Sequence, residues 1–230
     1  MRVSVVIPTF NEAGNIETLL RRLFHALEMA AMRGEAIVVD DRSPDGTADV
    51  AEETLGGRGR VLRRQGPRGL AFAVEDGFAE ARSEVICVMD ADLSHPPESV
   101  PALVKAVEDG ADLAVGSRYV AGGGIAGWPR TRRLLSRAAC LMARPLTPIR
   151  DSTSGFFCLR RPVIEGLDLH TGGFKIGLEL FVRGNIKRVR EIPFTFTDRQ
   201  AGRSKLGRSV MLQYLLQLAR LSAHRFGRRG

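Results

Sequence analysis

The sequence has few cysteines and few aromatic side chains, and it lacks any long hydrophobic run. Only 3 of its 230 residues are cysteine, and Cys87, Cys140 and Cys158 are widely separated among apolar neighbours. This spacing argues against a disulfide framework or a zinc site and predicts buried free thiols in a reducing compartment. No segment approaches the roughly 20 apolar residues that a membrane-spanning helix needs. We therefore expect a cytoplasmic protein, or one that lies on a membrane without crossing it.

The charge of the chain is mostly of one sign. Lysine and arginine number 34 against 26 acidic residues, so the formal net charge is +8. Such a chain favours an anionic partner, which can be nucleic acid, an acidic membrane surface or a phosphorylated ligand. Aromatic residues make up only 6% of the sequence and no nucleic-acid-binding motif occurs. A basic nucleic-acid-binding protein is therefore kept only as the alternative from a different class.

Short β-branched runs alternate with helical patterns through the first half of the chain. Strands are predicted at 3–7, 37–39, 61–62, 85–89 and 113–115, and helices at 16–27, 47–55, 71–81 and 98–109. This alternation predicts an α/β protein with a mostly parallel central sheet and helices on both faces. In the second half we expect a mobile glycine-rich segment after Tyr119, helices at 134–143 and 177–183, and strands at 156–159 and 189–196.

Polar residues follow four of the predicted strands at the point where each strand ends. They are Asn11 and Glu12, Asp40 and Asp41, Asp90 and Asp92, and Ser117 and Arg118. Exposed strand ends are naturally polar, which accounts for one or two such groups. Ligands of open parallel sheets bind outside the carboxyl ends of the strands, so four groups on one edge predict a ligand site.

The stretch VMDADLSHPP places two carboxylates two residues apart directly after an apolar run. Alternate residues of an extended chain point the same way, so Asp90 and Asp92 can both face a Mg²⁺ or Mn²⁺ ion that also binds substrate phosphate. For the neighbouring His95 a structural role is the stronger interpretation. The glycines at 122–127 match a dinucleotide-binding pattern only formally, because Trp128 and Pro129 prevent a helix from beginning there.

The C-terminal segment differs in character from the rest of the chain. On a helix, Gln213, Gln217 and Arg220 form one narrow polar stripe and leave the other positions largely apolar. Basic residues flank the segment on both sides. We expect a catalytic domain over 1–208 and an amphipathic helix over 209–230, which either lies on anionic lipid or packs on the domain or at a dimer contact.

Five motifs occur in an order that carries a resemblance: VVIPTFNEAGNI, IVVDDRSPDGT, VMDADLSHPP, VGSRYVAGGG and DRQAGRSKLG. Over residues 1–215 the chain resembles the family-2 glycosyltransferases of GT-A (Rossmann-like) fold, and within them the dolichyl-phosphate and polyprenyl-phosphate mannose synthases. The sequence departs from this family at Ser94, where some relatives have glutamine, and at Arg42, where glycine or aspartate is frequent. Ala71 and Arg203 are further departures.

The resemblance implies a set of site residues. The nucleotide pocket would be lined by Pro8, Phe10, Glu12, Val39 and Asp41. Metal and donor diphosphate would be held by Asp90, Ala91 and Asp92, with Ser94 near the ion, and the donor phosphates would also meet Lys175, Arg199 and Lys205. Arg118, Arg132 and Ser136 would meet the acceptor phosphate. Catalysis itself would depend on Asp92, Arg118, Arg132 and Lys205.

The implied reaction is the inverting, metal-dependent transfer of mannose from GDP-mannose to a polyprenyl phosphate, with Mg²⁺ or Mn²⁺ as cofactor. The implied partners are the nucleotide sugar, the polyprenyl-phosphate lipid, the cytoplasmic face of a membrane and a possible separate membrane subunit, without nucleic acid. A UDP-sugar such as UDP-glucose is the alternative donor for the same site. A degenerate, non-catalytic relative is a third hypothesis, against which the intact Asp90, Asp92 and Lys205 argue.

Overall fold

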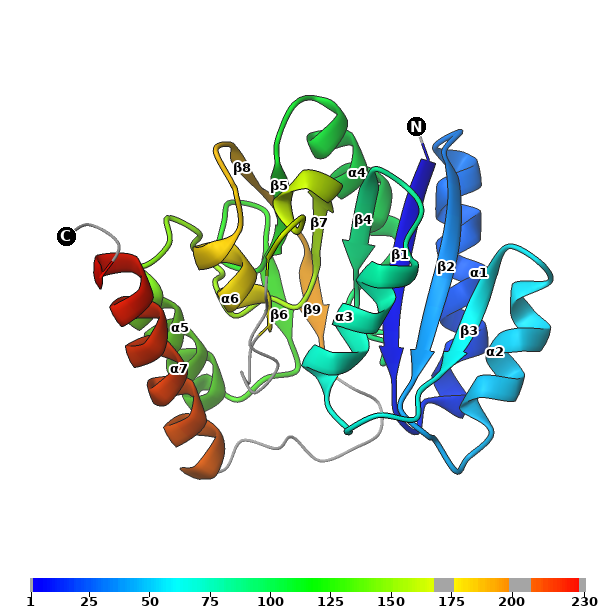
Figure 1. Ribbon diagram of the computed structural model, residues 1–230, viewed down its shortest axis with the longest axis horizontal. Helices are drawn as coiled ribbons and strands as arrows, with labels where there is room; N and C mark the ends of the chain where they lie inside the picture. The colour runs from blue at the N-terminus through cyan, green and yellow to red at the C-terminus, as the bar shows by residue number, and fades with distance from the viewer. Residues whose placement is uncertain (1, 168–175, 199–207, 228–230) are drawn as a thin grey trace.

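The computed structural model describes residues 2–167, 176–198 and 208–227, and it is an α/β structure with helices on both faces of a large sheet (Figure 1). The elements in chain order are β1 (Arg2–Thr9), α1 (Ala13–Met29), β2 (Arg33–Asp40), α2 (Thr47–Leu55), β3 (Gly59–Arg63), α3 (Leu70–Glu80), β4 (Val85–Val88), η1 (Pro97–Ser99), α4 (Val100–Glu108), β5 (Leu113–Ser117), β6 (Gly124–Ala126), α5 (Arg130–Ala143), β7 (Phe157–Arg160), η2 (Arg161–Val163), α6 (Ile176–Arg183), β8 (Val189–Pro193), β9 (Thr195–Thr197) and α7 (Arg208–Gly227). The predicted fold class is confirmed.

The main sheet has the strand order β3-β2-β1-β4-β7-β5-β8. Its central strands are buried on both faces, which explains their continuous β-branched runs. Val5 and Ile7 of β1 face one apolar cluster with residues of α1 and α4, whereas Val6 faces a second cluster with residues of α3. Two helical layers therefore cover the two faces of the sheet.

Strand β7 is the exception to the parallel arrangement. It lies between β4 and β5 and is antiparallel to both. Cys158 of β7 lies opposite Cys87 of β4, and these two thiols and that of Cys140 are free and buried, as the sequence predicts. Because β7 runs the other way, the residues that precede it lie at the same edge where β1, β2, β4 and β5 end.

The segment after Tyr119 is more regular than predicted. Gly124–Ala126 forms β6, which pairs in parallel with β9 as a second, two-stranded sheet. The prediction of one strand over 189–196 is wrong, because the chain leaves the main sheet at Pro193 and Phe194. Proline has no N–H for a sheet hydrogen bond, and Phe194 turns inward against His95 and Phe156.

Helix α7 packs on α5 and α6 at one end of the molecule (left of Figure 1). Tyr214, Leu218 and Leu221 face this contact, and the Tyr214 hydroxyl donates to the Ala139 carbonyl at 2.8 Å. Gln217 of the predicted polar stripe is only 6% exposed, so the stripe does not lie wholly on the solvent side of the helix. Among the described residues, no helix is both long and apolar enough to cross a bilayer.

Candidate active site

The carboxyl ends of β1, β2, β4 and β5 lie at one edge of the sheet, at the bottom of Figure 1. The predicted polar groups after these four strands are therefore brought to one edge. Around them the structure adds residues of the β3–α3 loop and residues 151–155 before β7.

The two carboxylates after β4 are held in different ways. Asp92 is 8% exposed, and its Oδ1 accepts hydrogen bonds from the Ser94 amide at 3.0 Å and the Ser94 hydroxyl at 2.5 Å. The Asp90 side chain is 33% exposed and has His95 Nε2 at 3.8 Å from its Oδ2. Asp90 therefore has the more accessible carboxylate of the pair.

His95 packs beneath Asp90 and holds the loop after β4 by a hydrogen bond and a ring contact. Its Nδ1 accepts a hydrogen bond from the Asp90 amide at 3.0 Å, and its ring stacks on Phe156 at 5.0 Å. Burial lowers the pKa of His95, although the charges of Asp90 and Asp92 oppose this effect. A neutral imidazole fits the accepting role of Nδ1, so the structure agrees with the structural interpretation of this residue.

The carboxylates of Asp90 and Asp92, which follow β4, fit a hard divalent cation. Carboxylate oxygens suit Mg²⁺ and Mn²⁺, which commonly take their other ligands from water and phosphate. No group of three or more His, Cys, Asp or Glu side chains placed to hold a metal occurs among the described residues, so Asp90 and Asp92 would need those outside ligands. Gly155 lies beside this carboxylate, because a Cβ at this position would make ordinary van der Waals contact with Asp90 Oδ1 at 3.7 Å.

The residues predicted for the nucleotide pocket differ in accessibility. Pro8 and Val39 face each other as strand partners and are buried. Glu12 is partly exposed, and its Oε2 accepts a hydrogen bond from Asn15 at 2.8 Å. Phe10 is 42% exposed. Phe10 therefore offers the most accessible apolar surface of this set.

Asp41 is part of a buried charged network. Its Oδ1 accepts from Arg64 Nη1 at 2.8 Å and its Oδ2 from the Gly69 amide at 2.8 Å. Arg64 also donates to Asp76 at 2.5 Å, and its side chain is 3% exposed. Asp41 therefore fastens the β3–α3 loop to the end of β2, in addition to its position beside the predicted pocket.

On the other side of Asp90, Arg118 is locked to a residue that sequence reasoning missed. Asp151 accepts hydrogen bonds from Arg118 Nε at 2.7 Å, Nη2 at 2.6 Å and the backbone amide at 2.9 Å. Burial lowers the pKa of Arg118, but the hydrogen bonds and charge of Asp151 raise it above its ordinary value. The Arg118 guanidinium also lies 5.3 Å from the ring centres of Tyr119 and Trp128. It is therefore a charged, rigidly held group.

Arg132 and Ser136 lie one turn apart on α5 beside these aromatic residues. Arg132 Nη1 lies 3.0 Å from Asp198 Oδ1, and its guanidinium covers the Trp128 ring at 3.9 Å. Ser136 is half-buried next to Tyr119. The structure therefore brings Arg118, Arg132 and Ser136 to one region.

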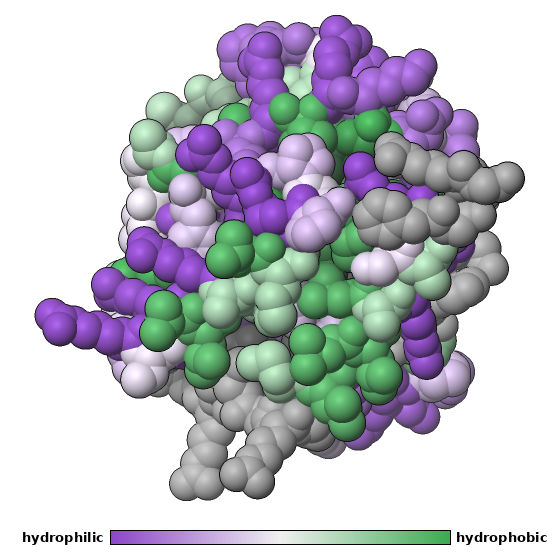
Figure 2. All heavy atoms as spheres, turned by 90° about the vertical axis from the view of Figure 1, so that its left-hand side faces the viewer, coloured by the Kyte–Doolittle hydropathy of each residue, from purple (hydrophilic) through white to green (hydrophobic). Residues whose placement is uncertain are grey.

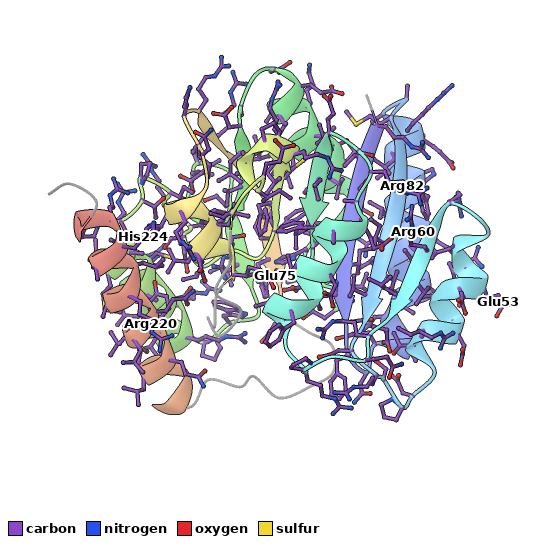
Figure 3. The ribbon with its side chains drawn as sticks, viewed as in Figure 1. Glu53, Arg60, Glu75, Arg82, Arg220 and His224 are labelled. Carbon is purple, nitrogen blue, oxygen red and sulfur yellow. The ribbon has the colours of Figure 1, made fainter. Side chains whose placement is uncertain are left out.

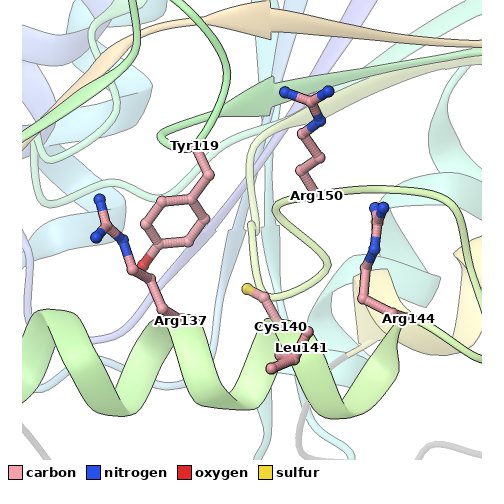
Figure 4. Close-up of a pocket in the computed structure, with 6 residues that line it drawn as sticks. All are labelled: Tyr119, Arg137, Cys140, Leu141, Arg144 and Arg150. Carbon is pink, nitrogen blue, oxygen red and sulfur yellow. The ribbon is translucent and has the colours of Figure 1, made fainter.

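A pocket of about 290 Å³ opens beside this region (Figure 4). It is lined by Tyr119, Arg137, Cys140, Leu141, Arg144 and Arg150. Four of these residues come from α5 or the turn that follows it, and the Tyr119 ring points toward the helix (Figure 4). A pocket with three arginines and an aromatic wall suits an anionic ligand that also carries apolar groups.

The outer faces of α5 and α7 carry exposed apolar side chains. Leu134 and Leu141 of α5 are 70% and 71% exposed, and Leu212 and Leu216 of α7 are 59% and 52% exposed. Figure 2 shows this side of the molecule, where hydrophobic side chains gather and hydrophilic ones surround them. Exposed apolar surface of this kind marks an interaction face.

Sequence reasoning missed Asp151 and Arg64. One available signal was the run DSTSG at 151–155, which is small and polar directly before an apolar strand. Arg64 had no signal, because its partners lie after β2 and in α3. Lys175, Arg199 and Lys205 lie outside the described residues.

Comparison with known proteins places these features in a family. Residues 4–167 match the sequence model of "Glycosyl transferase family 2". A dolichol-phosphate mannosyltransferase of Pyrococcus furiosus is 45% identical over 96% of this chain, which spans 64% of that relative's length. A dolichol-phosphate mannosyltransferase of Saccharomyces cerevisiae is 42% identical over 97% of this chain and 88% of the relative.

A similar solved structure is glucosyl-3-phosphoglycerate synthase of Mycobacterium tuberculosis in complex with Mn²⁺, UDP and glucosyl-3-phosphoglycerate. It superposes with a TM-score of 0.70 and 22% identity, covering 98% of this chain and 80% of that one. This likeness concerns the fold, and it confirms the predicted GT-A architecture.

Proposed function

Because this chain belongs to glycosyl transferase family 2, we propose that it transfers mannose from GDP-mannose to the phosphate of a polyprenyl phosphate. The products are polyprenyl-phosphate mannose and GDP. The observation that carries the proposal is the position of Asp90 between two sets of side chains. Phe10 and the Asp41 network lie toward β2, and the arginine-rich region of Arg118 lies toward β5.

On the donor side, Asp90 and Asp92 would hold Mg²⁺ or Mn²⁺ with the nucleotide diphosphate. Such a cation, when bound, neutralises charge that develops on the departing GDP. Ser94 orients Asp92 through two hydrogen bonds, and we propose it as a neighbour of the ion. Lys175, Arg199 and Lys205 remain proposed contacts of the donor phosphates.

On the acceptor side, Arg118, Arg132 and Ser136 would align the lipid phosphate. A phosphate oxygen is already anionic, so it attacks the anomeric carbon without a strong general base. The C–O bond to GDP breaks as the new bond forms, which inverts the configuration at that carbon. Asp151 keeps Arg118 in place and balances its charge, so the phosphate meets a fixed guanidinium.

The experiment measures transfer of labelled sugar to polyprenyl phosphate from GDP-mannose and, in parallel, from UDP-glucose, with Mg²⁺ or Mn²⁺ present. We expect label in the organic phase from GDP-mannose, and its loss in Asp92→Asn. Arg82→Ala is the control, because Arg82 precedes β4 at the opposite edge of the sheet (Figure 3). Label from UDP-glucose alone would refute the donor assignment, and label from neither donor would refute the lipid acceptor.

We also propose that the enzyme works as a peripheral membrane protein, with the apolar faces of α5 and α7 against the bilayer. The double variant Leu212→Asp, Leu216→Asp should lose binding to anionic liposomes. Met29→Asp is the matched control, because Met29 is 76% exposed on α1, away from this face. Liposome binding that the double variant retains in full would refute the membrane contact.

A further inference from the structure

The loop between β3 and α3 is fastened to the end of β2 at two points. Arg64, at the start of the loop, bonds to Asp41 Oδ1, and the amide of Gly69, at its end, bonds to Asp41 Oδ2, both at 2.8 Å. Gly69 has a φ of 151°, which is uncommon for residues with a side chain. Arg68 therefore projects from a short loop whose two ends are fixed.

Arg68 differs from the two other arginines of this region. Arg63 pairs with Asp49 and Glu52 on the surface, and Arg64 pairs with two buried or half-buried aspartates. Arg68 is exposed, and in the described part of the chain no carboxylate lies within ion-pair distance of it. Its contacts are one hydrogen bond of 3.3 Å from Nη2 to the Arg42 carbonyl and the Phe10 ring at 4.7 Å.

The sheet order fixes where Arg68 and Phe10 lie relative to the carboxylate of Asp90. From β4 outward the strands are β1, β2 and β3, and neighbouring strands are about 4.8 Å apart. Asp90 follows β4, Phe10 follows β1, and the loop with Arg68 follows β3. A nucleotide whose diphosphate lies at Asp90 and which extends along this edge toward β3 brings its base to Phe10 and Arg68.

We propose that Arg68 reads the base of the donor nucleotide and selects guanine. A guanidinium fork donates two parallel hydrogen bonds to the O6 and N7 acceptors of guanine. Uracil has no such pair of adjacent acceptors, and adenine places an amino donor at position 6. Phe10 supplies the apolar plane against which the base and the guanidinium rest. This inference rests on the proposed function, and it assigns the preference for a guanine nucleotide donor to Arg68.

The test measures equilibrium binding of GDP, inosine diphosphate, 7-deaza-GDP and UDP to the full chain with Mg²⁺ present. Inosine diphosphate keeps O6 and N7 and should bind about as tightly as GDP. UDP and 7-deaza-GDP should bind roughly tenfold more weakly, since one or both acceptors are lost. Equal affinities of the wild-type chain for GDP and 7-deaza-GDP would overturn the proposal without any substitution in the protein.

Two variants and a control complete the experiment. Arg68→Ala should weaken the binding of GDP and leave the binding of UDP nearly unchanged, so that the ratio of their dissociation constants approaches one. Arg68→Lys keeps the charge but not the fork, and it should not restore the ratio. Arg82→Ala removes the same charge at the opposite edge and should keep the ratio. If Arg68→Ala weakened the binding of GDP and of UDP equally, Arg68 would contact phosphate and not the base, and the proposal would be overturned.

The outcome is separable from that of the proposed function, which is measured by transfer to polyprenyl phosphate. Mannose transfer by a chain whose preference for GDP survives Arg68→Ala would overturn only the role of Arg68. A preference for GDP that depends on Arg68, without transfer to the lipid, would support base reading and overturn the acceptor.

Discussion

Replacement of Asp151 by alanine should leave the Arg118 guanidinium buried without its counter-charge. The Arg118 side chain is 7% exposed and that of Asp151 is 0% exposed, and the substitution removes hydrogen bonds from the Arg118 amide, Nε and Nη2. Removal of one partner of a buried ion pair costs about 3–5 kcal/mol. We expect a loss of this size in the free energy of unfolding, measured by urea titration followed by circular dichroism.

The control is Asp49→Ala, which removes a surface ion pair with a similar N···O distance. Asp49 lies 2.7 Å from Arg63 but is 76% exposed, so its loss should cost at most about 1 kcal/mol. In a cycle with Arg118→Ala, the coupling between positions 118 and 151 should reach about 2 kcal/mol. An Asp151→Ala variant as stable as Asp49→Ala would refute the argument that Asp151 holds this charge in place.

Three further predictions concern stability away from the reacting groups. Gly77→Ala should cost about 1–3 kcal/mol in thermal or urea unfolding, because a Cβ there would overlap a valine methyl of β1; an unchanged midpoint would contradict this packing. Arg42 has a φ of 62°, so Arg42→Gly should be roughly 1–2 kcal/mol more stable than Arg42→Val, and equal midpoints would count against backbone strain. Burial alone would raise the pKa of Glu35, but Ser4 and Arg60 lower it below its ordinary 4.5. Its stabilising effect is therefore present above about pH 4.5 and lost as the pH falls through the folded-state pKa; Glu35→Gln should flatten that acid loss, and an unchanged pH profile would refute it.

The first half of the fold could be predicted from the sequence because its signals are local. The strand predicted at 3–7 lies within β1, which continues through Pro8 to Thr9, and the helix predicted at 47–55 has the observed bounds Thr47–Leu55. Residue order alone does not give the sheet order, because β4 pairs with β1 and not with β3. The polar groups after these strands were predictable because each group directly follows its own apolar run in the sequence.

The second half was less predictable because its pairings are distant. An apolar run such as 156–159 gives no sign of its direction, so its antiparallel insertion as β7 could not be inferred. The pairing of β6 with β9 joins segments about 70 residues apart, and a strand of three residues, two of which are glycine and alanine, has little pattern of its own. Asp151 and Gly155 lie at the site only because β7, which follows them, runs antiparallel to its neighbours.

The aspartates of the site show why equal sequence signals lead to unequal roles. Asp41 directly follows β2 and Asp90 follows β4 after one further residue, yet the Asp41 side chain is 10% exposed and bonded to Arg64, whereas that of Asp90 is 33% exposed beside a neutral imidazole. A buried carboxylate requires a compensating charge, and Arg64 supplies it to Asp41 from within the chain. Asp90 has no guanidinium or ammonium partner among the described residues. A bound cation would supply Asp90 with the positive charge that Arg64 supplies to Asp41. The presence or absence of a protein cation beside each carboxylate therefore distinguishes a carboxylate that holds the fold from one that can hold a ligand.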